Sequence, residues 1–377
     1  MAENVASSYR WLRTGEEALA AMLDAIRAAQ KQDRLEVYTF AASPLGGQFL
    51  DALVQARQRG ARVQVMLDAI GSLSLPESFW EPLTSIGGEF RWFNPLKLGR
   101  LIYRDHRKLL VCDDGVAVIG GCNIAPEYQG DGVTGGWRDL GLLITGRLVG
   151  ELAGTFDDFF SRAEFKHKLL QRLRRSRSEK TRTGENWSLL LCGPGRRQTS
   201  LKRTLANDLA RARRVQIICA YFLPTWRIRK ELRGVVRRGG KVQLILAGKT
   251  DVRLSQLASR RLYRLFLRAG VEIHEYQPQV LHAKLLIVDG TVYVGSANLD
   301  ARSLSINYEL QLRLVDNQMA AEAREIFAKD LGHCRPIERR TWSKSRSVLT
   351  KLLEELAYFV LARLDPYVAR WRMKSLR

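Results

Sequence analysis

The stretch His106-Arg107-Lys108-Leu109-Leu110-Val111-Cys112-Asp113 returns in the second half of the chain as His282-Ala283-Lys284-Leu285-Leu286-Ile287-Val288-Asp289. Each copy is followed by a glycine-containing phrase that ends in asparagine, Gly120-Gly121-Cys122-Asn123 and Gly295-Ser296-Ala297-Asn298. The chain of 377 residues has only five histidines. Two of them occupy matched settings, which chance does not explain, so the sequence indicates an internal duplication.

Each copy predicts a β-hairpin, because two short apolar runs flank an Asp-Asp-Gly or Asp-Gly turn. The predicted strands are 109–111, 116–119, 285–288 and 291–294. Residues two apart on a strand share a face, so the His and Lys of each motif are expected to project together. Asp113 and Asp289 lie at an odd offset near the turn, which favours a structural role for these two motif residues. Asn123 and Asn298 end the return strands, where they can come back beside the histidines.

Helices and strands alternate before each motif, in the same order in both halves. The predicted helices are 17–30, 47–59, 201–211 and 228–238, and the predicted strands are 35–40, 63–68, 215–218 and 242–246. Gly60 and Gly239 follow two of these helices at matching positions, as C-terminal capping glycines do. The order predicts an α/β fold built from a duplicated domain.

The paired motifs resemble those of the phospholipase D superfamily. The phrase 295–309 is similar to the pattern G-S-x-N-x-D-x-R-S-x-x-x-N-x-E of bacterial cardiolipin synthases, and 120–128 with 137–139 is also typical of them. The resemblance covers about residues 8–335 and is to the short, type B-like synthases, because the membrane-inserted N-terminus of the long synthases is absent. It implies two homologous repeats, each a mixed β-sheet flanked by helices, packed about a pseudo-twofold axis with the active site between them.

Four segments are expected along the chain: a first phospholipase D-like domain, a basic linker, a second such domain and a basic amphipathic C-terminal tail. Their boundaries are 1–165, 166–186, 187–336 and 337–377. The linker is either solvated or in contact with anionic headgroups. The tail has apolar residues on one helical side, and it either packs on the fold or lies at a membrane interface.

Composition limits the protein class. No run approaches the roughly 18 to 20 apolar residues of a membrane span, and residues 1–8 lack a secretory core. Five cysteines without CxxC spacing indicate reduced thiols and no zinc site. We expect a cytoplasmic protein, peripheral on the inner face of the cell membrane. The net charge of +22 favours a polyanionic partner, either an anionic phospholipid surface or nucleic acid.

Phosphodiester transfer needs a nucleophile, an acid for the leaving group and positive charge at the nonbridging oxygens. Two imidazoles can fill the first two roles, one through a phosphohistidine intermediate and the other by proton transfer. The resemblance favours His106 as the nucleophile and His282 as the acid. Neither a metal nor another cofactor is expected, because the sequence shows no cluster of carboxylates. The predicted phosphate-binding groups are Lys108, Lys284, Asn123 and Asn298.

A carboxylate on the other ring nitrogen would orient each imidazole. The resemblance assigns this role to Asp139 and Glu309, each of which follows the histidine of its own repeat. The alternatives are an exposed ion pair of Asp139 with Arg138 and a strand-edge charge at Glu309. Tyr221, which follows a predicted strand, is a weaker candidate for a residue near the substrate.

Three functions remain in view. The first is a cardiolipin synthase-like phosphatidyltransferase, with phosphatidylglycerol and in one variant phosphatidylethanolamine as substrates. The second is a phospholipase D-type hydrolase, or a phosphodiesterase or nuclease of the same superfamily, although no aromatic-interleaved basic stripe favours nucleic acid. The third is a membrane-binding module without activity. The duplication supplies both motifs in one chain, so a monomer is sufficient for one active site.

Overall fold

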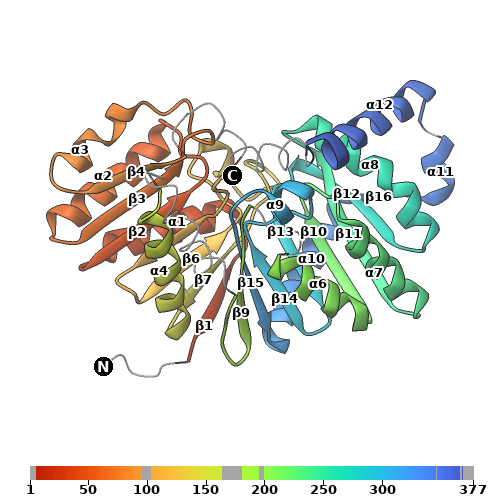
Figure 1. The fold of residues 1–377 in the computed structure, drawn as a ribbon, viewed down its shortest axis with the longest axis horizontal. Coiled ribbons are helices and arrows are strands. Elements are labelled where there is room, and N and C mark those ends of the chain that lie inside the picture. Colours follow the sequence, from red (N-terminus) through yellow and green to blue (C-terminus); the bar gives the residue numbers. More distant parts are fainter. Residues whose placement is uncertain are drawn as a thin grey trace. The chain divides into compact units, whose positions relative to one another are not determined.

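The computed structural model describes residues 6–94, 103–163, 181–194, 199–344, 346–365 and 367. The chain divides into two compact units (Figure 1). Unit 1 consists of Met1–Arg182 and Tyr308–Leu310, and unit 2 consists of Thr183–Asn307 and Gln311–Arg377. Unit 1 therefore includes a short piece of the second repeat. The predicted basic linker falls largely outside the described residues.

Unit 1 is built on a seven-stranded mixed sheet with the order β1-β7-β6-β5-β2-β3-β4. Its strands are β1 (Ser8–Leu12), β2 (Gln32–Val37), β3 (Arg62–Asp68), β4 (Glu89–Phe93), β5 (Leu109–Cys112), β6 (Val116–Gly120) and β7 (Gly141–Thr145). β2, β3 and β4 are parallel, whereas β5, β6, β7 and β1 pair antiparallel. The first histidine motif leads into β5, at the centre of this sheet.

Unit 2 repeats the arrangement with the order β9-β15-β14-β13-β10-β11-β12, and β8 and β16 extend the two edges. Its strands are β8 (Arg182–Thr183), β9 (Trp187–Cys192), β10 (Arg214–Cys219), β11 (Lys241–Lys249), β12 (Glu272–Val280), β13 (Lys284–Val288), β14 (Thr291–Gly295), β15 (Glu309–Val315) and β16 (Cys334–Pro336). The second motif leads into β13, the counterpart of β5. The predicted duplicated α/β fold with mixed sheets is confirmed.

Helices cover both faces of each sheet (Figure 1). The helices of unit 1 are α1 (Gly15–Ala28), α2 (Pro44–Gln58), η1 (Glu77–Trp80), α3 (Glu81–Thr84), η2 (Pro126–Tyr128) and α4 (Arg147–Phe160). Those of unit 2 are α6 (Ser200–Arg211), α7 (Trp226–Arg237), α8 (Arg253–Arg268), α9 (Ala301–Ser305), α10 (Asn317–Leu331), α11 (Arg339–Lys344), α12 (Val348–Phe359) and η3 (Val360–Leu364). Because helices lie on both faces, all four residues of β5 and all five of β13 are buried.

Helix boundaries follow local sequence signals. Thr14 caps α1 by accepting a hydrogen bond from the N–H of Glu17, and Ser43 caps α2 just before a proline. Gly60 and Gly239 end α2 and α7 with φ angles of 99° and 82°, a conformation that favours glycine. Both predicted capping glycines are therefore confirmed.

The predicted hairpins are confirmed as β5–β6 and β13–β14. The strand predicted at 35–40 lies earlier, because β2 ends at Val37. The chain leaves the sheet there, and Phe40 forms an isolated bridge with Ile124 instead. Phe222 and Leu299 form the matching bridge in unit 2.

The C-terminal tail forms α11, α12 and η3, and α12 packs along α8. On α12 itself, Glu354 and Ala357 are the buried residues. No helix in the described part of the chain is both long and apolar enough to cross a lipid bilayer.

Candidate active site

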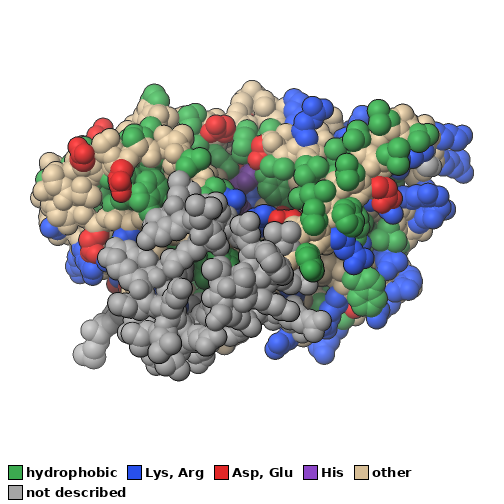
Figure 2. All heavy atoms as spheres, turned by 45° about the horizontal axis from the view of Figure 1, so that its top comes forward, with side chains coloured by type: hydrophobic (Ala, Val, Ile, Leu, Met, Phe, Trp, Pro, Cys, Tyr) green, Lys and Arg blue, Asp and Glu red, His purple; other side chains and the backbone are tan. Residues whose placement is uncertain are grey.

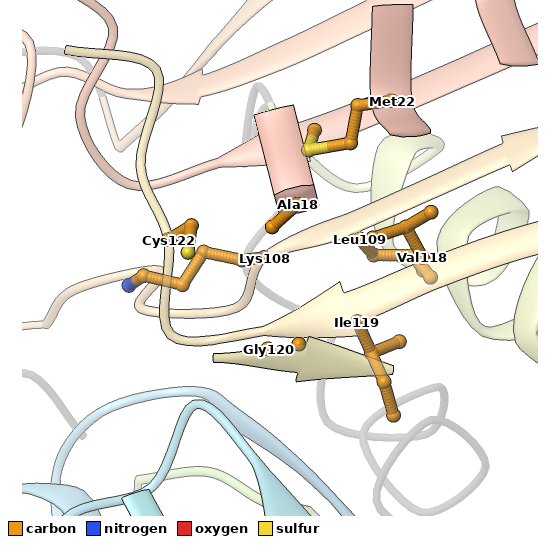
Figure 3. A pocket seen from close by; sticks show the side chains of 9 residues that line it. Ala18, Met22, Lys108, Leu109, Val118, Ile119, Gly120 and Cys122 are labelled. Atoms are coloured by element: carbon orange, nitrogen blue, oxygen red, sulfur yellow. The ribbon is translucent and has the colours of Figure 1, made fainter. Parts of the chain in front are cut away.

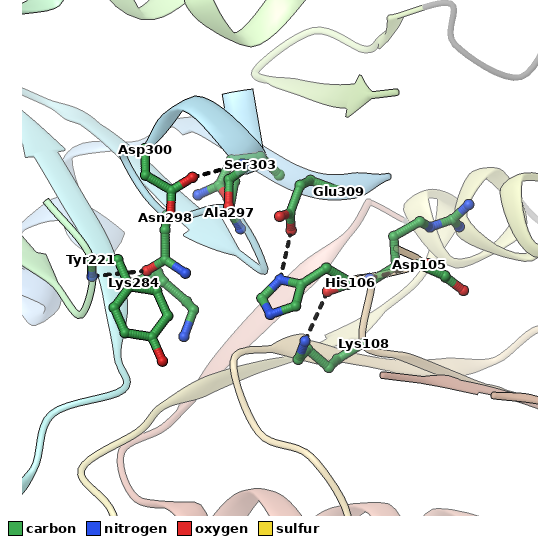
Figure 4. Close-up of polar contacts among 12 residues, drawn as sticks. Asp105, His106, Lys108, Tyr221, Lys284, Ala297, Asn298, Asp300, Ser303 and Glu309 are labelled. Atoms are coloured by element: carbon green, nitrogen blue, oxygen red, sulfur yellow. Dashed lines mark hydrogen bonds and ion pairs between the residues drawn. The ribbon is translucent and has the colours of Figure 1, made fainter. Parts of the chain in front are cut away.

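His106 lies in an extended segment that leads into β5. Its Nδ1 atom is 3.1 Å from Oε2 of Glu309 (Figure 4). The Glu309 side chain is fully buried and that of His106 is 12% exposed, so water screens the pair little. A carboxylate at Nδ1 favours the tautomer that carries its proton on this atom, which leaves the lone pair on Nε2. The arrangement prepares Nε2 for attack on an electrophile.

Backbone hydrogen bonds hold the segment that brings Glu309 to His106. Tyr308 forms an isolated bridge with Asp105, and its carbonyl accepts a hydrogen bond from the N–H of His106 at 3.0 Å. The sequence pairs Glu309 with His282, the histidine of its own repeat. The structure instead places Glu309 beside His106 in unit 1. Glu309 is fully buried, so the alternative of a strand-edge charge is wrong.

Asp139, the other predicted orienting carboxylate, is fully buried just before β7. Its Oδ1 atom accepts the N–H of Leu140 at 2.8 Å. Gly121 makes room for this side chain, because a Cβ there would lie 2.3 Å from Oδ1. The guanidinium of Arg138 is also buried and donates to the carbonyls of Arg13 and Asp139, both at 2.6 Å. The alternative of an exposed ion pair is therefore wrong, and the histidine that Asp139 orients stays a prediction.

Each motif lysine lies beside its own histidine. Nζ of Lys284 is 2.9 Å from Nδ1 and 3.2 Å from Nε2 of His282, and both residues are buried. Lys108 is also buried, and its Nζ donates to the carbonyl of His106 at 2.8 Å (Figure 4). The lysine ammonium group thus lies at the imidazole in the second copy and at the backbone carbonyl of the histidine in the first.

The motif asparagines tie the segments after the return strands β6 and β14 to the segments that follow β2 and β10. Oδ1 of Asn123 accepts the N–H of Thr39 at 3.2 Å, and Oδ1 of Asn298 accepts the N–H of Tyr221 at 3.3 Å (Figure 4). Nδ2 of Asn123 donates to the Tyr128 hydroxyl at 2.8 Å. Their carbonyl oxygens are therefore used for the fold, and a role in phosphate binding would have to come from the amide nitrogens.

The motif aspartates fasten the connections that lead into β2 and β10. Asp113 accepts three backbone N–H groups at 2.7 to 2.8 Å, from Gln30, Lys31 and Gln32. Asp289 accepts those of Arg213 and Arg214 at 2.8 to 3.2 Å. Burial raises the pKa of Asp113, but the three hydrogen bonds outweigh it and the pKa is lowered overall. These contacts support the structural interpretation of both aspartates.

A tyrosine ring lies near each histidine. The ring centroids of Tyr38 and His106 are 5.1 Å apart, and Nζ of Lys108 lies 5.2 Å from the Tyr38 centroid. The Tyr221 ring is 6.4 Å from that of His282, and its hydroxyl donates to the Asp251 carboxylate. Sequence reasoning missed Tyr38. The available signal was an aromatic residue directly after the strand next to the motif strand.

A buried charge cluster adjoins the first motif and was also missed. Glu36, Asp105 and Arg107 are all buried, and the Arg107 guanidinium is 3.1 Å from Oε2 of Glu36. Burial and the Glu36 carboxylate raise the pKa of Asp105 well above its ordinary value, although Arg107 opposes them. Burial likewise raises the pKa of Glu36.

At the corresponding positions of the second repeat, all of them described, no such cluster is present. Glu36 pairs with Leu109 in the sheet of unit 1, and Ile218 pairs with Leu285 at the same register in unit 2. The residues before and after His282 are Leu281 and Ala283, where the first motif has Asp105 and Arg107. The two histidines therefore sit in different electrostatic surroundings despite their common fold.

A small cavity lies between α1 and the strands β5 and β6 (Figure 3). Its lining consists of Ala18, Met22, Lys108, Leu109, Val118, Ile119, Gly120, Cys122 and Gly141. Lys108 contributes its aliphatic chain, which lies beside Cys122 (Figure 3). Because the rest of the lining is apolar, the cavity is a packing gap and offers no recognition of a phosphate. Among the described residues, no three His, Cys, Asp or Glu side chains are grouped to hold a metal ion.

Comparison with known proteins shows which protein family the chain resembles. The sequence model described as "Cardiolipin synthase, PLD-like domain" matches residues 22–158 and 205–331, which contain both motifs. Cardiolipin synthase 2 of Bacillus anthracis is 32% identical over 369 residues, which are 94% of this chain and 70% of that protein. Cardiolipin synthase B of Salmonella typhimurium is 30% identical over 356 residues, which are 90% of this chain and 85% of that protein.

A solved structure shares the fold. The phosphatidylserine synthase of Haemophilus influenzae superposes with a TM-score of 0.75, and the match covers 96% of this chain and 94% of that one. The sequence identity is 16%, so this likeness supports the architecture alone.

Proposed function

This chain belongs to the cardiolipin synthase family of phospholipase D-like proteins, and we propose that it is a phosphatidyltransferase that works through a phosphohistidine. It takes a phosphatidyl group from one phospholipid and passes it to an alcohol on another. The substrates are phosphatidylglycerol twice, or phosphatidylglycerol with phosphatidylethanolamine. The relatives carry the name cardiolipin synthase, which supports cardiolipin as the product, and the choice of the two substrate lipids is part of the proposal.

The contact between His106 and Glu309 carries the proposal. With the Nδ1 proton directed at the Glu309 carboxylate, Nε2 of His106 attacks phosphorus. A nitrogen–phosphorus bond forms and the bond from phosphorus to the headgroup oxygen breaks. Positive charge develops on the imidazole in this step, and a buried carboxylate 3.1 Å away stabilises it.

His282 moves the proton. It protonates the departing headgroup oxygen, then takes a proton from the hydroxyl of the acceptor lipid as that oxygen attacks phosphorus. The nitrogen–phosphorus bond breaks and His106 returns to its starting state. Lys108 and Lys284 offset the negative charge of the nonbridging oxygens.

The membrane is the source of both substrates. We place the protein peripherally on the inner face of the cell membrane, with an anionic phospholipid surface as its partner. The excess of 61 Lys and Arg over 39 Asp and Glu residues supports attraction to such a surface.

Lipid product analysis tests the proposal. Purified protein is incubated with phosphatidylglycerol vesicles, with and without phosphatidylethanolamine, beside the variants His106→Ala and His282→Ala. His333→Ala, outside both motifs, is the matched control. Cardiolipin from wild type and control alone is the expected result. Phosphatidic acid alone would make the protein a hydrolase, and DNA cleavage without any lipid product would make it a nuclease.

Trapping the intermediate tests the nucleophile. Lipid labelled in its phosphate is mixed with enzyme, the reaction is quenched in alkali, and the protein is digested. The label is expected on the peptide that contains His106 and is expected to be absent from His106→Ala. A label on the His282 peptide would reverse the two roles.

A further inference from the structure

Helix α12 lies on unit 2 with its apolar side outward. Its buried positions are Glu354 and Ala357. Six large apolar residues of the same helix, which we call the α12 apolar face, are 45% to 74% exposed: Val348, Leu349, Leu352, Leu353, Leu356 and Phe359. A contiguous apolar surface of this kind marks an interaction site.

Polar contacts hold the helix in this orientation. Glu354 forms a buried ion pair with Arg346, and Glu355 pairs with Arg261 of α8. The Tyr358 hydroxyl accepts a hydrogen bond from Arg229 of α7 at 3.0 Å. The leucines contribute little to this attachment, because they face away from the unit. No described residue therefore covers the leucines.

The surroundings of the α12 apolar face are basic. Helices α7 and α8 together carry ten Arg and Lys residues and a single Glu. On the helix itself Lys351 is exposed, and Arg363 is exposed in η3. Figure 2 shows hydrophobic side chains on the part of the surface that carries these helices, with Lys and Arg side chains at their border.

The apolar side chains and the basic surroundings together favour one kind of binding partner for the α12 apolar face. A second copy of the chain would bring like charges together, because the net charge is +22. Nucleic acid would match the charge but would leave the leucines exposed to water. An anionic phospholipid surface satisfies both, since apolar side chains enter the acyl boundary and basic side chains meet the headgroups.

The helix is also connected to the second motif. Asp365, directly after η3, accepts two hydrogen bonds from Arg302 of α9 at 2.6 and 2.8 Å. Asp300 caps α9, and it lies two residues after Asn298 of the motif. Further exposed apolar side chains, Trp226 and Leu254, lie at the starts of α7 and α8.

We propose that the α12 apolar face is a membrane-docking surface that lies in the interfacial layer of an anionic bilayer. The choice of a phospholipid partner rests on the proposed function, and the docking brings the second motif to the layer that holds its substrates. Insertion of the leucines supplies the apolar contribution, and the basic residues of α7 and α8 make binding depend on anionic lipid.

Vesicle co-sedimentation of the full chain tests the proposal. Wild type is expected to sediment with vesicles that contain phosphatidylglycerol and much less with pure phosphatidylcholine. The double variant Leu352→Gln/Leu356→Gln is expected to lose about tenfold or more in partition coefficient, because each leucine loses its apolar burial. The matched control Ile86→Gln/Val315→Gln replaces two exposed apolar residues outside α12 and is expected to bind like wild type.

The proposal would be overturned if the wild type and the double variant sedimented equally with vesicles. It would also be overturned if wild-type binding were the same with and without phosphatidylglycerol in the vesicles. Sedimentation velocity without vesicles adds a second readout. A wild-type dimer that the double variant converts to a monomer, with vesicle binding unchanged, would assign the face to a second copy and overturn membrane docking.

Docking and catalysis can fail separately. His106→Ala is expected to sediment like wild type, since docking requires no turnover. Intact sedimentation without any cardiolipin would reject the proposed function and leave docking in place. If the wild type formed cardiolipin from detergent-dispersed lipid but did not sediment with vesicles, docking would be rejected and the proposed function would stand.

Discussion

Oε2 of Glu309 lies 3.1 Å from Nδ1 of His106, although 203 residues separate the two along the chain. The carboxylate that orients the first histidine thus comes from the extension of the second motif. Both groups belong to unit 1, because the short piece Tyr308–Leu310 is part of it. We therefore expect substitutions at Glu309 to behave as changes to the first motif.

Glu309→Gln is expected to lower kcat for phosphatidyl transfer by about 100- to 10,000-fold with little change in KM, because the amide cannot stabilise an imidazolium by charge. Steady-state kinetics provide the measurement. Glu272→Gln, at a surface ion pair with Lys241, is the control. A Glu309→Gln enzyme with wild-type kcat would reject the orienting role.

Asp113→Ala is expected to lower the free energy of unfolding by about 1 to 3 kcal/mol, because three N–H groups lose their acceptor. The folded-state pKa of Asp113 is lowered, so its contribution is present above pH 4 and fades as the pH falls through that folded-state value. Urea unfolding at pH 7 and pH 3 measures both effects. Asp114→Ala controls for the backbone conformation, since both residues have a φ of 52°, and Arg34→Ala controls for the ion pair with Arg34 that Asp114→Ala also removes. Loss of kcat in folded Asp113→Ala protein would contradict a structural role.

Arg107→Leu is expected to destabilise the fold by about 3 to 5 kcal/mol, because Glu36 and Asp105 remain buried without their cation. The triple variant Glu36→Ile/Asp105→Leu/Arg107→Ala installs the residues of the second repeat and is expected to recover most of that loss. Urea unfolding of both variants and of wild type at pH 8 measures these changes in the free energy of unfolding. A triple variant no more stable than Arg107→Leu would show that the cluster does more than balance its own charges.

Stability is expected to fall between pH 4 and pH 7 because of Asp33. Burial between strands raises the pKa of this carboxyl group to about 7, and the Cys112 thiol and Arg59 offset only part of the rise. The folded protein therefore holds a proton that the unfolded chain releases near pH 4, so its stability decreases as the pH rises to 7. A rise of about three pKa units corresponds to about 4 kcal/mol.

Asp33→Asn removes this titration, so its stability relative to wild type is expected to increase from pH 4 to pH 8. Thermal or urea unfolding at the two values measures it, and exposed Asp24→Asn serves as the control. The same pH dependence in Asp33→Asn and wild type would assign the effect to other groups.

Local signals were sufficient to predict the elements that carry the site. The apolar run after His106 ends at a turn, which predicts a hairpin whatever surrounds it, and Gly60 marks a helix end by its conformational freedom. The partner of Glu309 could not be predicted in this way. Position along the chain pairs it with His282, whereas the contact depends on how distant segments fold together.

The charge cluster was missed for a related reason. The apolar, charged, apolar order of Leu35, Glu36 and Val37 is typical of a strand with one solvent-exposed face. Such a strand would leave Glu36 exposed to solvent. The strand is central and covered on both faces, so Glu36 needs Arg107 from a different part of the chain. A single strand's pattern does not reveal which segment supplies that cation.

Unit 1 is assembled from two separate pieces of chain, and this limits how the gene can change. A gene split between the repeats would encode a first half whose His106 has no Glu309. The first repeat made without the second is therefore expected to lack the carboxylate that orients its histidine. Recombination that exchanges one half between relatives must also preserve the tripeptide Tyr308–Leu310, because it serves the other half.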